Sequence, residues 1–267
     1  MGYATHMRDE PMTAEVARPP RAGPPALHVA GLRKRFGSTD VLAGIDLRVS
    51  AGAAFGLVGA NGAGKTTLIK CVLDFCAFDS GAIEIFGTRS GDPRARSRIA
   101  FVPERFVPPH YLRCVEFLQM MLALAGERFE RARAERQLAE LELDPAILDS
   151  PVRQLSKGMN QKLGLAACFM VARDLYLLDE PMSGLDPASR VAVKSVLSRL
   201  ARDGRTLFFT SHVMADVEEL CTELAVLDLG RVRYCGTPGE LCALHAEPRL
   251  ERAFIKCIHG EQSARRA

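Results

Sequence analysis

The stretch Gly56-Leu57-Val58-Gly59-Ala60-Asn61-Gly62-Ala63-Gly64-Lys65-Thr66-Thr67 decides how this chain folds. Its core, residues 59–66, fits the pattern G-x-x-x-x-G-K-[ST], which forms phosphate-binding loops. An apolar run at residues 53–58 precedes the loop and predicts a buried strand, and a helical pattern at 66–74 follows it. The motif therefore stands in the strand–loop–helix context that it requires.

The residue types in this loop suit a nucleotide. Glycines allow the backbone to curl, so that successive N–H groups ring a phosphate at the positive N-terminal end of the following helix. Lys65 can neutralise charge on the β- and γ-phosphates, and the Thr66 hydroxyl can hold Mg²⁺. The residues expected to bind nucleotide here are Gly59, Asn61, Gly62, Ala63, Gly64, Lys65, Thr66 and Thr67. Taken alone, the loop leaves open a chance glycine-rich turn with a surface lysine.

Length and composition place the chain among ordinary globular proteins. It has 267 residues, of which 48% are apolar and 25% charged. A net charge of +3 is too small to indicate a nucleic-acid surface, so no nucleic-acid partner is expected. The longest apolar run, residues 163–172, is shorter than the ~20 residues that span a bilayer. We therefore expect a chain that does not itself cross a membrane.

The N-terminal segment and the cysteines carry little functional signal. Residues 1–25 lack the apolar core of a signal peptide, and we expect them to be disordered. The eight cysteines show no C-x-x-C spacing and no cysteine–histidine cluster. Reduced thiols used as small apolar side chains, in a cytoplasmic protein, are the expectation.

The remaining patterns predict an α/β protein with a mostly parallel sheet. Strand patterns cover residues 27–36, 41–49, 53–58, 82–86, 99–102, 175–178, 206–210, 224–227 and 232–235. Helix patterns cover residues 66–74, 114–125, 128–143, 156–172, 188–200 and 214–221. We expect a turn at 37–40, a loop at 88–98 and an α-helical insertion at about 88–172. Buried strands that alternate with helices indicate parallel pairing, and the first two strands predict an antiparallel N-terminal portion.

Two adjacent carboxylates end the apolar strand at residues 175–178. Asp179 at such a strand end can approach Mg²⁺ directly or through water, and Glu180 can orient or deprotonate an attacking water. Acids at strand ends also serve as solubilising caps. Downstream of a phosphate loop, we expect Asp179 on the metal side and Glu180 as the general base.

The order of motifs resembles the ATP-binding subunit of an ABC transporter. Leu155-Ser156-Lys157-Gly158-Met159 resembles the family's LSGGQ signature, in a form found in subunits of ABC-2-type exporters. Ser183-Gly184-Leu185-Asp186 is similar to the D-loop, and His212 follows Thr210-Ser211 as the switch histidine does. Phe36 is similar to the aromatic residue that stacks on adenine. Gly236-Thr237-Pro238 and residues 250–255 resemble the end of the domain in the exporter subgroup, so that the resemblance covers residues 27–260.

This resemblance implies a P-loop NTPase (RecA-like) fold, an ATPase activity and a set of site residues. The implied domain spans residues 26–245, followed by a short C-terminal extension at 246–267. Ser156, Gly158, Asp186, Phe36 and His212 join the nucleotide site, with Lys65, Glu180 and His212 as the catalytic residues. The implied cofactors are ATP and Mg²⁺.

The resemblance also implies partners. In the family, the signature faces the phosphate loop of a second nucleotide-binding subunit, either the same chain or a close relative. A separate membrane permease completes the transporter, which places the subunit on the cytoplasmic face of the inner (cell) membrane.

The sequence departs from the family pattern at two positions. Glu104 stands where the family usually has the glutamine that contacts the metal and its water. A glutamate still accepts hydrogen bonds, so we expect Glu104 at the nucleotide and metal, but it cannot donate when ionised. Lys157 replaces the first glycine of the signature, and it either reaches phosphate or faces solvent.

Other functional classes compete with the transporter interpretation. A soluble ABC-type ATPase that regulates a ribosomal or DNA-associated complex is the main alternative. Translation-factor relatives carry two such domains and DNA-repair relatives carry long coiled coils, and neither feature is present in the sequence. A GTPase lacks support because no Asn-Lys-x-Asp segment occurs, and a kinase would not need residues 156–159.

Overall fold

A computed structural model describes residues 23–264 of the chain, which form two β-sheets with helices around them. The antiparallel sheet has the order β2 (Thr39–Val49), β1 (Leu27–Phe36), β4 (Ser80–Ile85) and β5 (Thr88–Arg89). The second sheet has the order β10 (Arg231–Gly236), β9 (Glu223–Asp228), β3 (Ala54–Val58), β8 (Thr206–Ser211), β7 (Leu175–Leu178) and β6 (Ile99–Val102). It is parallel except at β10, which confirms the predicted α/β class.

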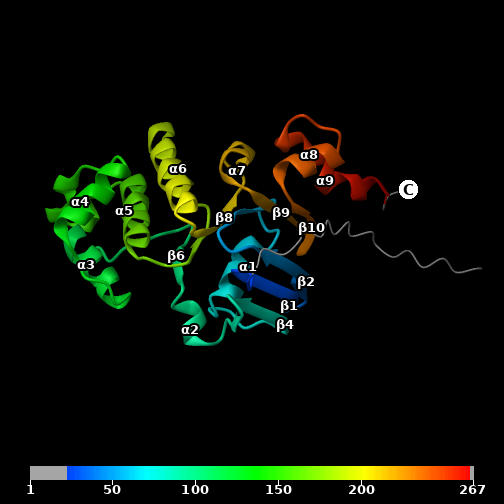
Figure 1. Ribbon diagram of the computed structural model, residues 1–267, viewed down its shortest axis with the longest axis horizontal. Coiled ribbons are helices and arrows are strands. Elements are labelled where there is room, and N and C mark those ends of the chain that lie inside the picture. Colours follow the sequence, from blue (N-terminus) through cyan, green and yellow to red (C-terminus); the bar gives the residue numbers. More distant parts are fainter. Residues whose placement is uncertain (1–22, 265–267) are drawn as a thin grey trace, which may run out of the picture.

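The helices divide into a group beside the sheets and a group at one end of the molecule. The first group is α1 (Lys65–Val72), α2 (Pro93–Arg96), α6 (Pro187–Arg202), α7 (Met214–Leu220), α8 (Pro238–Leu244) and α9 (Leu250–Ala264). The second is α3 (Cys114–Leu124), α4 (Arg131–Glu140) and α5 (Lys157–Met170), with the 3₁₀ turns η1 (Pro145–Asp149) and η2 (Val152–Gln154). Figure 1 shows α3, α4 and α5 gathered at the end away from the antiparallel sheet.

The central strands are buried on both faces, so each strand serves two cores. In β3, Phe55 and Leu57 join the core beneath the antiparallel sheet, whereas Ala54 and Val58 face the other core. The ring of Phe55 stacks on Phe208 of β8 at a centroid distance of 5.5 Å. This period-two division between two apolar cores explains why these strands read as continuous apolar runs.

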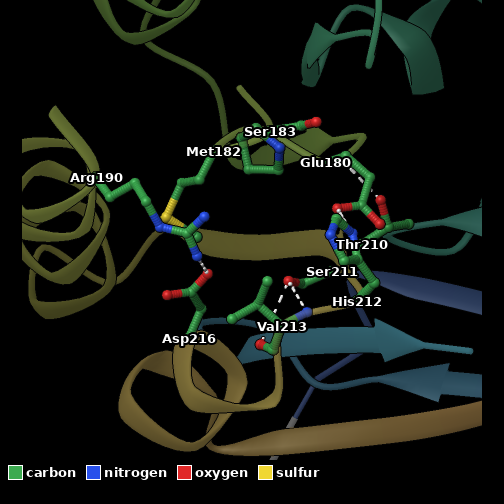
Figure 2. A pocket seen from close by; sticks show the side chains of 10 residues that line it. Glu180, Met182, Ser183, Arg190, Thr210, Ser211, His212, Val213 and Asp216 are labelled. Carbon is green, nitrogen blue, oxygen red and sulfur yellow. Dashed lines mark hydrogen bonds and ion pairs between the residues drawn. The ribbon is translucent and has the colours of Figure 1, made fainter. Parts of the chain in front are cut away.

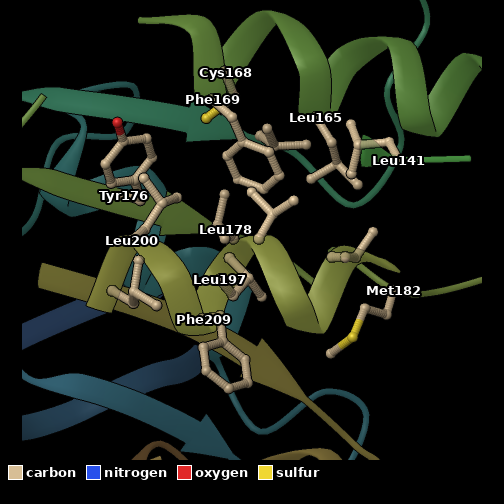
Figure 3. Close-up of a cluster of buried hydrophobic side chains, with 14 of the residues drawn as sticks. Leu141, Leu165, Cys168, Phe169, Tyr176, Leu178, Met182, Leu197, Leu200 and Phe209 are labelled. Atoms are coloured by element: carbon tan, nitrogen blue, oxygen red, sulfur yellow. The ribbon is translucent and has the colours of Figure 1, made fainter. Parts of the chain in front are cut away.

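The second core joins the sheet to the helical end of the molecule. Figure 3 shows Phe169 of α5, Tyr176 of β7 and Leu197 of α6 within one buried cluster. The rings of Phe169 and Tyr176 lie 6.2 Å apart, and the Tyr176 hydroxyl donates a hydrogen bond of 2.9 Å to the carbonyl of Val171. The helical segment therefore packs on the same core as β7 and β8.

Residues 88–98 do not form the loop expected from the sequence. They form β5, which pairs with β4, and the short helix α2. Asp92 caps α2 by accepting a hydrogen bond of 2.8 Å from Arg94 N–H, and Pro93 takes the first helical position. Since β6 pairs with β7 in the parallel sheet, the helical segment begins after β6 and not near residue 88.

Two expected boundaries also shift. The turn between β1 and β2 is confined to Gly37 and Ser38, with Gly37 at φ 59°. At the other end, α9 packs against α7, α8, β9 and β10, and its Leu250 and Ala253 belong to the main core. Residue 246 is therefore not a structural boundary. Of the tail expected to be disordered, residues 1–22 lie outside the described part.

The membrane and cysteine expectations can be compared with the described residues. Within residues 23–264, no helix is long and apolar enough to cross a membrane. None of the eight cysteines forms a disulfide. Burial raises the pKa of the Cys71 thiol to about 12 and that of Cys114 to about 11, which keeps both protonated at neutral pH.

Candidate active site

The phosphate loop, between β3 and α1, forms one wall of a cleft of about 660 Å³. The carboxyl ends of the parallel strands bring β7 and β8 to the same edge of the sheet as the loop. The cleft is lined by Val41, Gly59, Ala60, Asn61, Gly62, Gly64, Lys65, Thr66, Thr67, Glu104, Asp179, Glu180, Ser183, His212, Met214 and Phe254.

Two loop positions require glycine for steric reasons. A Cβ on Gly59 would lie 2.3 Å from the carbonyl oxygen of Leu227. Gly64 has φ 110°, and a Cβ there would lie 2.9 Å from the carbonyl oxygen of Val41. The backbone of the loop thus sits against β2 and β9 without side chains between them, which leaves its inner face to a ligand.

The Lys65 side chain is held against the loop by hydrogen bonds to two carbonyl groups of the loop. The side chain is buried, and its Nζ donates hydrogen bonds of 2.8 Å to the carbonyl of Gly59 and 3.2 Å to that of Ala60. The ammonium group therefore lies at the mouth of the ring of loop amides, where it faces an incoming phosphate.

Asp179 follows β7 directly and is only 2% exposed. Its Oδ2 accepts a hydrogen bond of 2.9 Å from the Thr66 hydroxyl, and its backbone N–H donates to the carbonyl of Val102 in β6. A buried carboxylate is held in place only where donors satisfy it. Asp179 thereby joins the sheet edge to the first turn of α1.

Glu180 has an unusual backbone conformation, with φ 48°. Its N–H donates a hydrogen bond of 2.8 Å to the hydroxyl of Thr210 in β8. This left-handed conformation is uncommon for a residue with a side chain and persists where its surroundings hold it. It turns the Glu180 carboxylate toward the cleft.

Glu180 and His212 form a close pair at the edge of the cleft. His212 Nδ1 lies 2.8 Å from Glu180 Oε2, and the two side chains point toward each other in Figure 2. The Glu180 side chain is 11% exposed, against 59% for His212. On the opposite side of the pocket drawn in Figure 2, Arg190 of α6 is paired with the buried Asp216 of α7 at 2.5 Å, which ties the segments after Glu180 and His212 together. This ion pair helps to fix the positions of the two segments that carry Glu180 and His212.

Five predicted site residues do not line this cleft. Ala63 is buried behind the loop, where its carbonyl accepts a hydrogen bond from Gly230. Phe36 is 52% exposed at the end of β1, with Lys34 Nζ 4.9 Å from the centroid of its ring. Ser156 caps α5 by accepting from Met159 N–H at 3.2 Å. The two remaining residues are Gly158 and Asp186.

Asp186 serves as the N-cap of α6. Its carboxylate accepts hydrogen bonds from the hydroxyl of Ser189 at 2.7 Å and from the Ser189 N–H at 3.0 Å. These two donors hold the pKa of the Asp186 carboxyl below its usual range. Within this one chain, Asp186 acts at a helix start and not on the cleft.

Sequence reasoning missed several residues at the site. Val41, Ser183, Met214 and Phe254 line the cleft, and Thr210 supports it from within β8. Thr210 and Ser183 stand inside the motifs that contain His212 and Asp186, so proximity within a motif was an available signal. Phe254 lies on α9, and no sequence pattern connects that helix with the phosphate loop.

The residues present fit a magnesium–nucleotide complex. The loop glycines let the backbone lie directly against β2 and β9, and the cleft size suits a nucleotide. Thr66 and Asp179 place a hydroxyl and a carboxylate oxygen 2.9 Å apart. Hard oxygen donors, one or two in number and shared with phosphates, are the ligands that Mg²⁺ takes in such sites.

Comparison with known proteins points to one family. The family model described as ABC transporter matches residues 42–183, more than half of the chain. The Nod factor export ATP-binding protein I of Ralstonia nicotianae is 37% identical, over 81% of this chain and 68% of that protein. The daunorubicin/doxorubicin resistance ATP-binding protein of Streptomyces peucetius is 36% identical, over 81% and 66% of the respective chains.

Comparison of the fold with solved structures identifies the same family. A solved structure of an ATP-binding subunit of an ABC transporter superposes with a TM-score of 0.79 at 29% identity, covering 87% of this chain and 99% of the other. The chain spans 56 to 73% of the length of curated relatives that it matches. The chain therefore belongs to the ABC transporter family and carries that family's ATP-binding ATPase domain, a P-loop NTPase fold.

Proposed function

We propose that this chain is the ATP-hydrolysing subunit of an exporter of the ABC-2 kind and that it powers a separate membrane permease. The observation that carries the proposal is the continuous set of contacts from Thr66 through Asp179 to Glu180 and His212 at one edge of the cleft. The relatives named for Nod factor export and for daunorubicin resistance support the direction of transport.

Each residue of the cleft has a separate role in the proposed hydrolysis of ATP. The loop amides and Lys65 bind the phosphates, and Thr66 and Asp179 would hold Mg²⁺, with Glu104 at the rim of the same cleft. Bound Mg²⁺ would supply charge neutralisation at the β- and γ-phosphates. The Glu180 carboxylate accepts a proton from the attacking water. His212 orients Glu180 when Nδ1–H donates to the Glu180 carboxylate, and Nε2 donates to the γ-phosphate only in the imidazolium form, which carries a proton on both ring nitrogens.

A second subunit would complete the site. Ser156 and Gly158 lie at the start of α5, outside the cleft of their own chain. A helix start with unsatisfied N–H groups is an anion-binding end. We infer that these residues act on the nucleotide of a second copy or of a close relative, with Asp186 near the contact and Phe36 stacked on the adenine.

The permease would dock beside Glu104. Two large apolar side chains near Glu104 face solvent, with Val107 70% and Tyr111 83% exposed. Exposed apolar side chains in one short segment suit a protein contact. Such docking would place the subunit on the cytoplasmic face of the inner membrane.

Purification of the tagged subunit from gently solubilised membranes tests this proposal. We expect a membrane protein to co-purify with the wild type, less with Tyr111→Glu, and fully with the control Leu244→Glu. Leu244 is 60% exposed on α8, at the other end of the molecule. Ribosomes or DNA in place of a membrane protein would favour the regulatory alternative and contradict the proposal.

A further inference from the structure

The hydroxyl of Thr210 contacts both acidic residues of the site at once. Thr210 is fully buried in β8, and its Oγ1 donates a hydrogen bond of 2.7 Å to Asp179 Oδ1. The same oxygen accepts the hydrogen bond of 2.8 Å from Glu180 N–H. Figure 2 shows Thr210 beneath Glu180 and beside His212. One side chain thus joins the metal-side carboxylate to the backbone of the general base.

Strand register explains how Thr210 reaches both residues. In the parallel pairing of β7 with β8, Leu178 lies opposite Phe209. The next step along both strands brings Thr210 opposite Asp179, at the edge of the sheet where the cleft lies. The position of Thr210 is therefore set by the sheet, and a rigid sheet can hold a side chain more exactly than a loop can.

The two hydrogen bonds have different consequences. Donation to Oδ1 fixes the Asp179 carboxylate so that Oδ2 faces Thr66, from which it accepts at 2.9 Å. Acceptance from Glu180 N–H satisfies the backbone at a residue with φ 48°. Without that acceptor, the left-handed turn that directs Glu180 to His212 loses a buried partner.

We propose that Thr210 is a positioning residue for ATP hydrolysis, which sets Asp179 toward the metal and Glu180 toward the attacking water. The role needs a group that donates and accepts at the same time, which a hydroxyl does and a methyl group does not. Ser211, the neighbouring hydroxyl, bonds instead to the backbone of Val213. This inference rests on the proposed ATPase function.

Thr206 offers a matched control on the same strand. It is 1% exposed, and its hydroxyl accepts one hydrogen bond of 2.9 Å from Gly52 N–H, at the end of β8 away from the cleft. Thr206→Val and Thr210→Val each replace a buried threonine of β8 by a side chain of the same shape. A general loss of strand stability would therefore appear in both variants, and a site-specific loss in Thr210→Val alone.

The experiment measures turnover, nucleotide binding and amide exchange in the full chain. In Thr210→Val we expect turnover to fall about 10- to 100-fold, as when the hydrogen-bond partner of a metal ligand is lost. Binding of a fluorescent ATP analogue should lose its strengthening by Mg²⁺ but stay unchanged in EDTA. Without nucleotide, the Glu180 amide should exchange faster. Thr210→Ser should restore all three readouts, and Thr206→Val should resemble the wild type.

The outcomes separate the inference from the function on which it rests. If Thr210→Val matches Thr206→Val in turnover, Mg²⁺ response and amide exchange, the positioning role is wrong. That role is also wrong if Thr210→Ser is as impaired as Thr210→Val. If the wild type has no Mg²⁺-dependent ATPase activity, the proposed function itself fails.

Discussion

Glu180 combines a nearly buried charged side chain with an unusual backbone conformation and the proposed role of general base. Its side chain is nearly buried and contacts His212, yet its backbone takes a conformation that residues with side chains seldom adopt. Strain of this kind costs about 1–3 kcal/mol and persists where the surroundings over-determine it. Here the surroundings are β7, β8 and the Thr210 hydroxyl.

Glu180→Gln should separate binding from chemistry. Glutamine keeps the shape and one oxygen of the side chain but does not accept a proton, so turnover should fall about 10²–10⁴-fold. ATP binding should remain, and ATP should trap a dimer that size-exclusion chromatography detects. Glu218→Gln, at an exposed position of α7, is the control and should behave as the wild type. Normal turnover in Glu180→Gln would remove Glu180 from the general-base role.

In β4, Gly81 is required both by its backbone conformation and by a close approach to β1. Gly81 has φ 107°, and a Cβ there would lie 2.7 Å from the carbonyl oxygen of Ala30 and from the Cα of Leu32. These backbone atoms belong to β1, at an irregularity in its pairing with β4. The absence of a side chain at Gly81 lets β4 lie directly against the backbone of β1 at this irregularity.

Gly81→Ala should therefore weaken the antiparallel sheet. We expect the free energy of unfolding to fall by about 1–3 kcal/mol or more, because alanine adds both strain and a clash with backbone. Gly91→Ala is the control, since a Cβ on Gly91 meets nothing within 4 Å, and it should change stability by less than about 0.5 kcal/mol. Urea denaturation followed by circular dichroism measures both. Equal midpoints for the two variants would contradict the steric role of Gly81.

The helices and strands differ in how well the sequence predicts them. The buried strands and the helices α1, α3, α4, α5, α6 and α7 were predicted because apolar periodicity follows the core, and their ends differ from the structure by a few residues. The long helix α9 was not predicted as a helix. Two short helices, α2 and α8, were missed because so few residues give little periodicity. Their capping residues were visible nonetheless: Asp92 with Pro93 begins α2, and Thr237 with Glu240 forms a capping box for α8.

The whole molecule explains which site residues the sequence could locate. The phosphate loop, Asp179, Glu180 and His212 were found because each stands in a compact local motif. Phe254 was not, because it reaches the cleft only through the packing of α9 on α7 and β10, a tertiary arrangement that no local pattern encodes. The roles of Ser156 and Gly158 remain predictions, because a single chain keeps them away from its own cleft.

Mixing two inactive variants tests whether two chains share the site. Lys65→Ala should bind ATP weakly because the ammonium group that binds the phosphates is lost. Gly158→Asp should fold, since a Cβ there meets nothing closer than 3.9 Å, but place a negative charge against phosphate. If the loop of one chain works with the α5 start of another, the mixed dimer holds one intact site and ATPase activity returns on mixing. No activity beyond the sum of the separate variants would contradict the shared site.

The pairing of β3 affects how the protein folds during its synthesis. This strand lies at the centre of the parallel sheet and directly precedes the phosphate loop, yet both of its neighbours, β8 and β9, come from the last third of the chain. During synthesis, the fully apolar β3 leaves the ribosome long before either neighbour exists. Such distant pairing slows folding and leaves an unpaired strand open to aggregation. We therefore expect the nascent chain to need protection of β3 from aggregation, and its nucleotide loop to take its final shape only near the end of translation.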